Sequence, residues 1–188
     1  MAAATVDQLA QVLDDAEPLI VAVDGERWAG PTPCTDWTVR QLVNHLVGGN
    51  LMFAAIVDGL PVDRSTTDHL GADPVAAYRK AADAVVAAFS RPGALEQVVT
   101  VPFGTVPGMV ALHLRITEVL VHGWDLAGAI GAVTGFPDDI VAQELAFTRT
   151  ALADVPPDRS PFASPQPVAD DAPIIDQLAA CLGRSVAS

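Results

Sequence analysis

One short segment of the chain carries the residues best suited to chemistry. Glu118 and His122 stand four residues apart, and Asp125 follows three residues later. If the segment is helical, Glu118 and His122 lie on one face, with Asp125 close to it. With the distant His45, the segment offers one carboxylate and two imidazoles, which suit a divalent metal that keeps one coordination position open for chemistry. These residues are therefore a candidate metal site.

Each of these residues also has a plainer interpretation. His45 has apolar neighbours, and a neutral core histidine with a backbone partner is the more frequent role at such a position. An acid and a histidine four residues apart are common on helix surfaces. Two features favour the metal site. Glu118 follows Ile116 and precedes an apolar run from Val119, where a carboxylate needs a partner or a metal. Facing helices of a bundle also commonly hold metals.

Other polar residues near the motif have several alternative roles. Asp125 has three alternative roles: a fourth metal ligand, a hydrogen-bond partner that orients His122, or a cap for a neighbouring helix. The last two roles are favoured. Arg115 lies three residues before Glu118 and is a candidate for binding a substrate carboxylate, although a surface salt bridge is the more frequent role. His113 lies about 140° round the helix from Glu118, which makes it a poor co-ligand. No other catalytic residue is assigned.

The elements that must position these residues are predicted to be helical. Apolar spacing and helix-end signals predict helices at about 5–24, 35–58, 73–90, 107–130, 137–154 and 173–182. Residues 95–107 alternate and are β-branched, which indicates a short extended ribbon or an ordered loop. Residues 25–34 and 155–172 are predicted loops.

Local signals set the predicted helix ends. Thr35 or Asp36 is the expected N-cap of the second helix, and Asp73 caps the third. Pro137 is expected at the first position of the fifth helix, and Gly183 is the expected C-cap of the last. Gly48 and the glycine after it fall inside a helical pattern, where they favour close helix packing.

These elements predict an all-α protein, a bundle of four main helices with an extra short helix and loop decorations. The 188 residues suit one domain over 1–188, because a chain of this size buries roughly 70% of its unfolded surface. No additional C-terminal domain is expected. A homodimer is one alternative for the oligomeric state, since alanine-rich bundles often pair through a flat face.

Charge and cysteine content exclude several classes of function. The formal net charge is −13, from 10 basic and 23 acidic residues, so binding to nucleic acid or to an anionic membrane surface is not expected. The two cysteines, Cys34 and Cys181, do not make a disulfide framework. The N-terminus lacks the basic region of a signal peptide. These features predict a cytoplasmic protein.

Two segments resemble a known family. Pro31–Gly49 resembles the second-helix signature of the mycothiol-dependent maleylpyruvate isomerase family, which belongs to the DinB/YfiT-like metal-binding four-helix bundles. Glu118–Ala127 resembles the helix that supplies the remaining metal ligands in that family. The stretch from Arg159 to Arg184 is similar to the closing segment of a short actinobacterial subgroup.

The resemblance implies a DinB-like bundle that holds a divalent metal, usually zinc, on His45, Glu118 and His122. The same donor set also suits Fe(II) and Ni(II). The resemblance further implies mycothiol as the thiol cosubstrate and a small-molecule electrophile as the molecule with which the thiol reacts. In the isomerase the thiolate adds to a conjugated alkene, permits rotation and leaves, whereas in related transferases it stays on the electrophile. Without an additional C-terminal domain, a substrate other than maleylpyruvate is expected.

Three hypotheses about function follow. The favoured one is a metal-dependent thiol S-transferase or isomerase, in which the metal activates the thiol. The second is a non-catalytic metal-binding or interaction module that uses the same ligands. The third is a purely structural bundle whose histidines are core residues, and it predicts that no metal binds.

Overall fold

The structure, a computed structural model, describes residues 3–34, 37–62, 67–102, 104–153, 155 and 162–186. Thr35 and Asp36, the expected caps of the second helix, lie outside these residues, as does Asp154, the expected end of the fifth helix.

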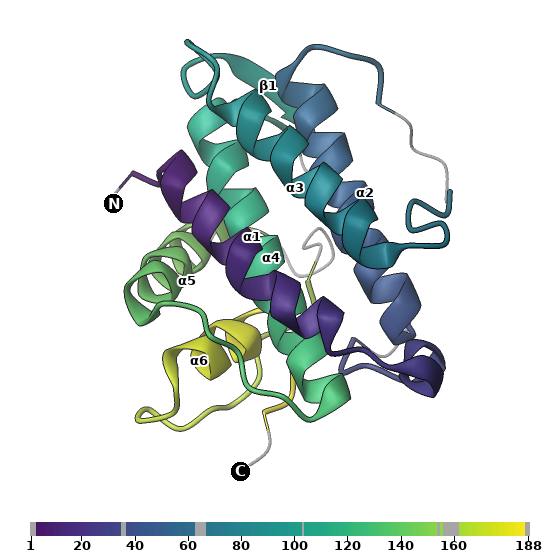
Figure 1. Cartoon of the computed structure of the whole chain (residues 1–188). Helices are drawn as coiled ribbons and strands as arrows, with labels where there is room; N and C mark the ends of the chain where they lie inside the picture. The colour runs from purple at the N-terminus through teal and green to yellow at the C-terminus, as the bar shows by residue number, and fades with distance from the viewer. Residues whose placement is uncertain are drawn as a thin grey trace.

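Four helices form the bundle (Figure 1). They are α1 Val6–Val21, α2 Val39–Val57, α3 Pro74–Phe89 and α4 Gly108–Ile130. α1 and α2 each pack against both α3 and α4, which closes a ring of four contacts around a shared apolar core. The predicted four-helix bundle is therefore confirmed, and α2 and α4, which carry the candidate ligands, are direct neighbours in it.

Smaller elements surround the bundle. The helices α5 Asp138–Leu152 and α6 Ile174–Cys181 pack against each other and against α4. The predicted ribbon is an antiparallel hairpin of β1 Val98–Val101 and β2 Gly104–Pro107, and it contacts α2 and α4. The predicted loop at 25–34 begins with a short 3-10 helix, η1 Gly25–Ala29.

The N-terminus of α2 differs from the prediction. Thr38, and neither Thr35 nor Asp36, is its N-cap, and Thr38 forms a capping box with Gln41. The Thr38 side chain accepts from the Gln41 backbone N–H while the Gln41 side chain accepts from the Thr38 backbone N–H. This reciprocal pair satisfies two N–H groups that a helix leaves without internal partners, so the helix begins where glutamine stands three residues after threonine.

Other helix ends lie one residue from their predicted positions or agree with them. Pro137 is the N-cap of α5 and not its first residue. Leu182 is the C-cap of α6, and Gly183 follows it with φ +86°. The predicted cap of α3 is confirmed, because the Asp73 side chain accepts from the Ala76 backbone N–H at 3.0 Å.

α4 is the central helix, because it touches α1, α2, α5, α6 and the hairpin. Most of its residues are buried, and some of them are polar: His113, Arg115, Thr117, His122 and Asp125. A buried polar or charged group costs free energy unless it finds a partner. The buried polar residues of α4 therefore need partners inside the fold or a bound ligand.

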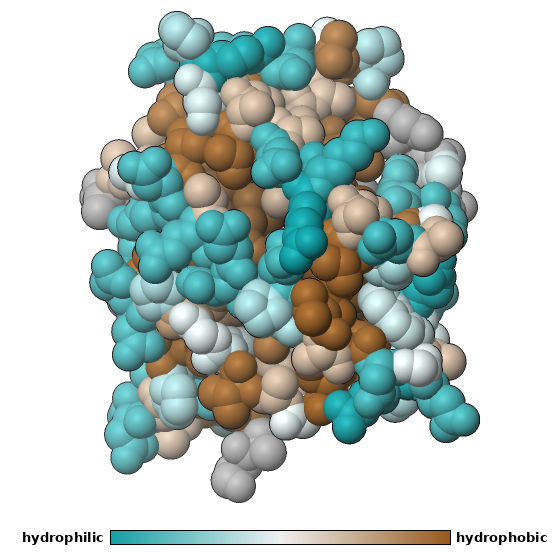
Figure 2. Space-filling view, in the orientation of Figure 1, coloured by the Kyte–Doolittle hydropathy of each residue, from teal (hydrophilic) through white to brown (hydrophobic). Residues whose placement is uncertain are grey.

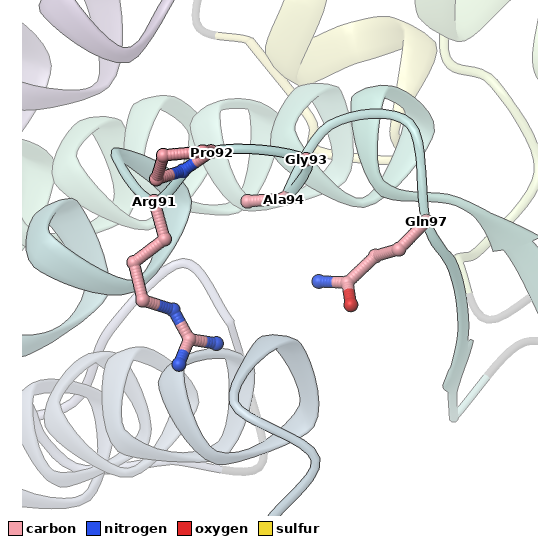
Figure 3. Close-up of a pocket in the computed structure, with 5 residues that line it drawn as sticks. All are labelled: Arg91, Pro92, Gly93, Ala94 and Gln97. Atoms are coloured by element: carbon pink, nitrogen blue, oxygen red, sulfur yellow. The ribbon is translucent and has the colours of Figure 1, made fainter.

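A surface pocket of about 310 Å³ lies in the segment that joins α3 to the hairpin. Two of its lining residues reach the end of α2, since Arg91 Nη2 and Gln97 Nε2 each donate to the Val57 carbonyl at 2.9 Å (Figure 3). Arg91 also pairs with Asp58. These contacts satisfy a carbonyl that the helix end leaves open, so the residues of this pocket help to terminate α2.

The face of the molecule in Figure 2 is mostly polar, with apolar areas between the polar side chains. Among the residues that the structure describes, no helix combines the length and the apolar character needed to cross a lipid bilayer.

Candidate metal centre

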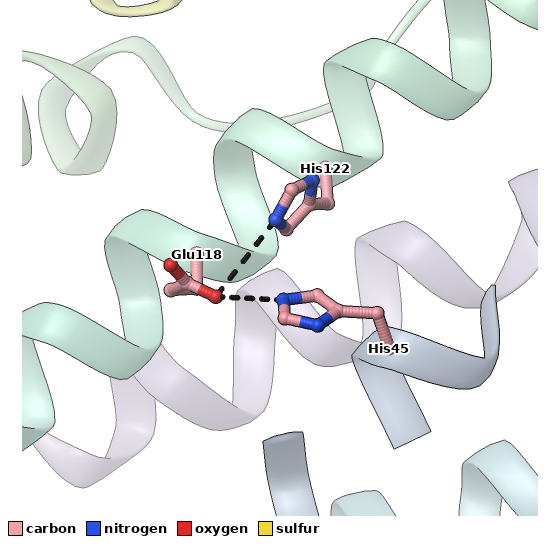
Figure 4. A group of neighbouring side chains, drawn as sticks. All are labelled: His45, Glu118 and His122. Carbon is pink, nitrogen blue, oxygen red and sulfur yellow. Dashed lines mark hydrogen bonds and ion pairs between the residues drawn. The ribbon is translucent and has the colours of Figure 1, made fainter. Parts of the chain in front are cut away.

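Three side chains from α2 and α4 meet at one point (Figure 4). His45 Nε2 lies 3.1 Å from Glu118 Oε2, and His122 Nε2 lies 3.8 Å from the same oxygen. One possible ligand atom from each residue lies within 4.8 Å of the other two. The helical spacing places Glu118 and His122 one turn apart on α4, and the packing of α2 on α4 adds His45.

The exposure of the three side chains gives the cluster an open side. The exposed fraction is 37% for His45, 12% for Glu118 and 5% for His122. The cluster is thus closed on the α4 side and reaches solvent on the His45 side. Two imidazole nitrogens and one carboxylate oxygen are the protein donor set of several catalytic zinc sites, and the partly exposed His45 leaves the cluster in contact with solvent, so these residues fit such a metal.

A buried carboxylate orients His122. Its Nδ1 lies 3.0 Å from Asp125 Oδ2, and Asp125 is completely buried. Because an ionised carboxylate only accepts, Nδ1 carries the proton and Nε2 presents its lone pair to the cluster. This position is that of the orienting partner expected from the sequence.

Asp125 has a second partner that the sequence did not indicate. Arg184, beyond the end of α6, donates from Nη2 to Asp125 Oδ2 at 2.9 Å and from Nε to Oδ1 at 3.3 Å. The two residues are 59 positions apart, and neither spacing nor periodicity links them. Only the packing of the C-terminal residues against α4 brings this arginine to the centre.

The electrostatics of the cluster suit a metal at neutral pH. Burial alone would raise the pKa of Glu118, but the His45 hydrogen bond and the nearby His122, His45 and Arg115 charges lower it from 4.5 to about 2. Burial lowers the pKa of His122 below 6.5, against the opposing effect of Asp125. At pH 7 the cluster therefore offers a carboxylate and a neutral imidazole, the protonation states in which these groups bind metals.

Trp37 lies against both imidazoles. Its ring centroid is 4.5 Å from that of His45 and 5.5 Å from that of His122. The indole therefore limits the movement of the two histidines and contributes apolar surface beside the cluster. Trp124 lies elsewhere and donates from Nε1 to Asp176 of α6 at 2.7 Å.

Arg115 is not on the surface, so the predicted surface salt bridge is wrong. Its side chain is completely buried, and all three guanidinium nitrogens lack a hydrogen-bond partner among the described residues. The guanidinium carbon lies 5.7 Å from the centre of the Phe53 ring. A Cβ at Gly49 would lie 2.1 Å from Arg115 Nη1, so glycine here allows α2 to approach α4 closely, as its sequence context indicated.

His113 stays apart from the cluster, as its angular position on the helix predicted. Its Nδ1 lies 2.9 Å from Glu144 Oε1 of α5, and its Nε2 accepts from the Ala4 backbone N–H at 3.3 Å. Thr117 donates to the same carboxylate at 3.2 Å. This buried group joins α4 to α5 and to the start of the chain.

The pKa shifts predict the acid stability of the metal-free protein. The unfolded chain takes up a proton at His122 near pH 6.5 and at Glu118 near pH 4.5, whereas the folded protein resists both. We therefore expect the free energy of unfolding to fall as the pH drops below about 6.5, and further between 4.5 and 2. Urea denaturation across this range measures it.

Glu118→Gln should flatten the lower part of that pH profile, because its amide does not titrate. Glu26→Gln, at an exposed residue of η1, serves as the matched control. A profile that is equally steep between pH 4.5 and 2 in wild type and Glu118→Gln would contradict the expectation.

Comparison with known proteins places this geometry in context. The family model of the mycothiol maleylpyruvate isomerase N-terminal domain matches residues 9–127. That range contains His45, Glu118, His122 and Asp125, and it ends before Arg184. Two uncharacterised proteins of Mycobacterium tuberculosis, from strains CDC 1551 and H37Rv, are each 37% identical over 171 residues, which cover 89% of this chain and 91% of theirs.

Solved structures agree with the fold. The crystal structure of mycothiol-dependent maleylpyruvate isomerase matches with a TM-score of 0.62 at 17% identity. A variant of that enzyme with one histidine replaced by alanine matches with a TM-score of 0.63 at 16% identity. Each match covers 79% of this chain and 72% of the other. At such low identity the likeness establishes the shared architecture.

Proposed function

We propose, from the premise that this chain belongs to the mycothiol maleylpyruvate isomerase N-terminal domain family, that it is a zinc-dependent enzyme that uses a low-molecular-weight thiol of the mycothiol type. It would act on a small electrophile as an S-transferase or an isomerase. The observation that carries the proposal is the meeting of His45, Glu118 and His122 with one side open to solvent.

The residues of the centre would divide the work. His45, Glu118 and His122 would hold the metal, and Asp125 would keep the proton on Nδ1 of His122 so that Nε2 faces the metal. Trp37 would shield the imidazoles from water. When bound, the metal would lower the pKa of the thiol and so keep its sulfur as a thiolate at neutral pH.

Arg115 is the candidate for a substrate carboxylate. Its guanidinium is buried beside Glu118 on α4, and its nitrogens have no partner among the described residues. Complete burial means that a carboxylate could reach this residue only from within the bundle. A fixed positive charge near Glu118 also favours anionic electrophiles by attraction alone.

Two reaction types fit the proposed thiol chemistry. In an isomerisation the thiolate sulfur bonds to one carbon of a conjugated double bond, whose electron pair moves onto the conjugated acceptor group. The remaining single bond rotates, the electron pair returns to re-form the double bond, and the carbon–sulfur bond breaks, which regenerates the thiolate. In a transfer the carbon–sulfur bond persists, and the proton of the thiol goes to the neighbouring carbon or leaves with the departing group.

The test is a thiol titration of the protein loaded with Co²⁺ in place of zinc. We expect mycothiol to produce a new sulfur-to-cobalt absorption band in the near ultraviolet, and S-methylated mycothiol, which has no thiol, to produce none. The Co²⁺ protein that shows this absorption band would then be incubated with mycothiol and conjugated electrophiles. Isomerised or S-conjugated product would be measured by chromatography.

Two outcomes of this test would exclude the proposed function. A cobalt spectrum that does not respond to mycothiol would overturn the thiol enzyme and favour the non-catalytic metal-binding module. Failure of the protein to take up cobalt or zinc at all would remove both functions and leave a structural bundle.

A further inference from the structure

We propose that Arg184 is a positioning residue that couples the C-terminal segment, defined here as residues 174–186, to metal binding. The inference rests on the metal-binding part of the proposed function and does not require the thiol chemistry. It goes beyond the ligand set because it assigns a role in that site to a part of the chain that the family model does not cover.

The first step is a chain of buried contacts from the cluster to the C-terminal segment. His122 Nδ1 donates to Asp125 Oδ2 at 3.0 Å, and Arg184 Nη2 donates to the same oxygen at 2.9 Å. Asp125 is completely buried, and the Arg184 side chain is only 11% exposed. Charge-assisted bonds of this kind, shielded from water, are short and directional, so Arg184 sets the orientation of Asp125.

The second step is that the fold of the segment fixes Arg184. Its backbone N–H donates to the Ala179 carbonyl at 3.0 Å, and its Nη1 donates to the Leu182 carbonyl at 3.0 Å. Gly183 turns the chain with φ +86°, and a Cβ there would lie 2.6 Å from that of Ala163. The guanidinium therefore reaches Asp125 only while α6 and the turn after it keep their places.

The third step is thermodynamic. If the docked segment holds Asp125 in the position that favours metal binding at His122, metal binding must favour the docked segment by the same factor. Undocking would leave the buried Asp125 with His122 as its remaining partner among the contacts described. Partners of this kind typically change metal affinity 10–100-fold when they are removed.

The segment has a second contact with α4 that serves as a matched control. Asp176 accepts from Trp124 Nε1 at 2.7 Å, and this bond involves neither the three candidate ligands nor Asp125. Loss of this bond should loosen the segment without altering Asp125. The buried residues Leu178, Ala179 and Ala180 keep α6 largely docked in such a variant.

The experiment combines zinc affinity, measured by competition with a chromophoric chelator, and hydrogen exchange of the amides of residues 174–186. In wild type we expect zinc to slow this exchange. We expect Arg184→Met to weaken zinc binding about 10-fold or more and to abolish the effect of zinc on exchange. Arg184→Lys should restore part of the affinity, and Asp176→Ala, which removes the acceptor for Trp124 Nε1, should speed exchange while affinity stays within about twofold of wild type.

Two results would overturn the coupling while leaving metal binding intact. One is a wild-type protein that binds zinc with no change of exchange in residues 174–186, a measurement that needs no variant. The other is a folded Arg184→Met protein with wild-type zinc affinity. Absence of zinc binding in wild type would instead remove the proposed function itself.

Discussion

One zinc ion per chain is the expected metal content of the wild-type protein after incubation with zinc, measured by mass spectrometry of the untagged protein. His45→Ala, Glu118→Ala and His122→Ala should each lower zinc affinity by more than about 100-fold, because each removes a ligand and not merely a partner of a ligand. One ligand atom from each residue lies within 4.8 Å of the other two, and no fourth His, Cys, Asp or Glu belongs to this group among the residues that the structure describes.

His69→Ala is the matched control, since His69 is a histidine of a loop that stands outside the cluster. It should retain the full equivalent of zinc. Equal losses in His69→Ala and His45→Ala would point to non-specific binding, and a metal-free wild type would leave the three residues as a buried hydrogen-bonded group.

The same substitution at two buried arginines should change stability in opposite directions. Arg115 is completely buried without a hydrogen-bond partner among the described residues, whereas Arg184 forms two bonds to Asp125. We expect Arg115→Met to raise the free energy of unfolding by about 1–3 kcal/mol, because it removes a buried charge whose guanidinium nitrogens have no hydrogen-bond partner among the described residues. Arg184→Met should lower it by about 3 kcal/mol, because it leaves the carboxylate of Asp125 underpaired in the interior.

Urea denaturation of the metal-free variants at pH 7 measures both effects. The Arg115→Met protein should still bind zinc, since the three metal ligands are unchanged and a positive charge near the metal has been removed. If Arg115 binds a substrate carboxylate, this variant should raise KM for acidic electrophiles and leave neutral ones unaffected. Destabilisation in Arg115→Met as large as in Arg184→Met would mean that the Arg115 guanidinium has compensating partners in solution.

Much of the architecture could be predicted from local signals. Apolar spacing located the α-helices that the described part of the chain forms, and the family was identified from the segments around His45 and Glu118, which the family model confirms. The prediction of the α2 N-cap was wrong because three neighbouring residues, Thr35, Asp36 and Thr38, have side chains that can cap a helix. The structure selects Thr38, where a glutamine three residues later completes the pair.

Spacing along the chain was enough to predict the features that depend on sequence neighbours. A helix places Glu118 and His122 on one face and turns His113 away, because its period fixes the angle between residues. His113 indeed pairs with Glu144 and not with the cluster.

The packing of the helices established the contacts across the bundle. It set the 3.1 Å approach of His45 to Glu118, the contact of Trp37 with both imidazoles, the burial of Arg115 and the reach of Arg184 to Asp125. These features depend on which helix faces pack together and how closely. That choice follows from the summed burial of many side chains and leaves no signal in the spacing of the residues that it brings into contact.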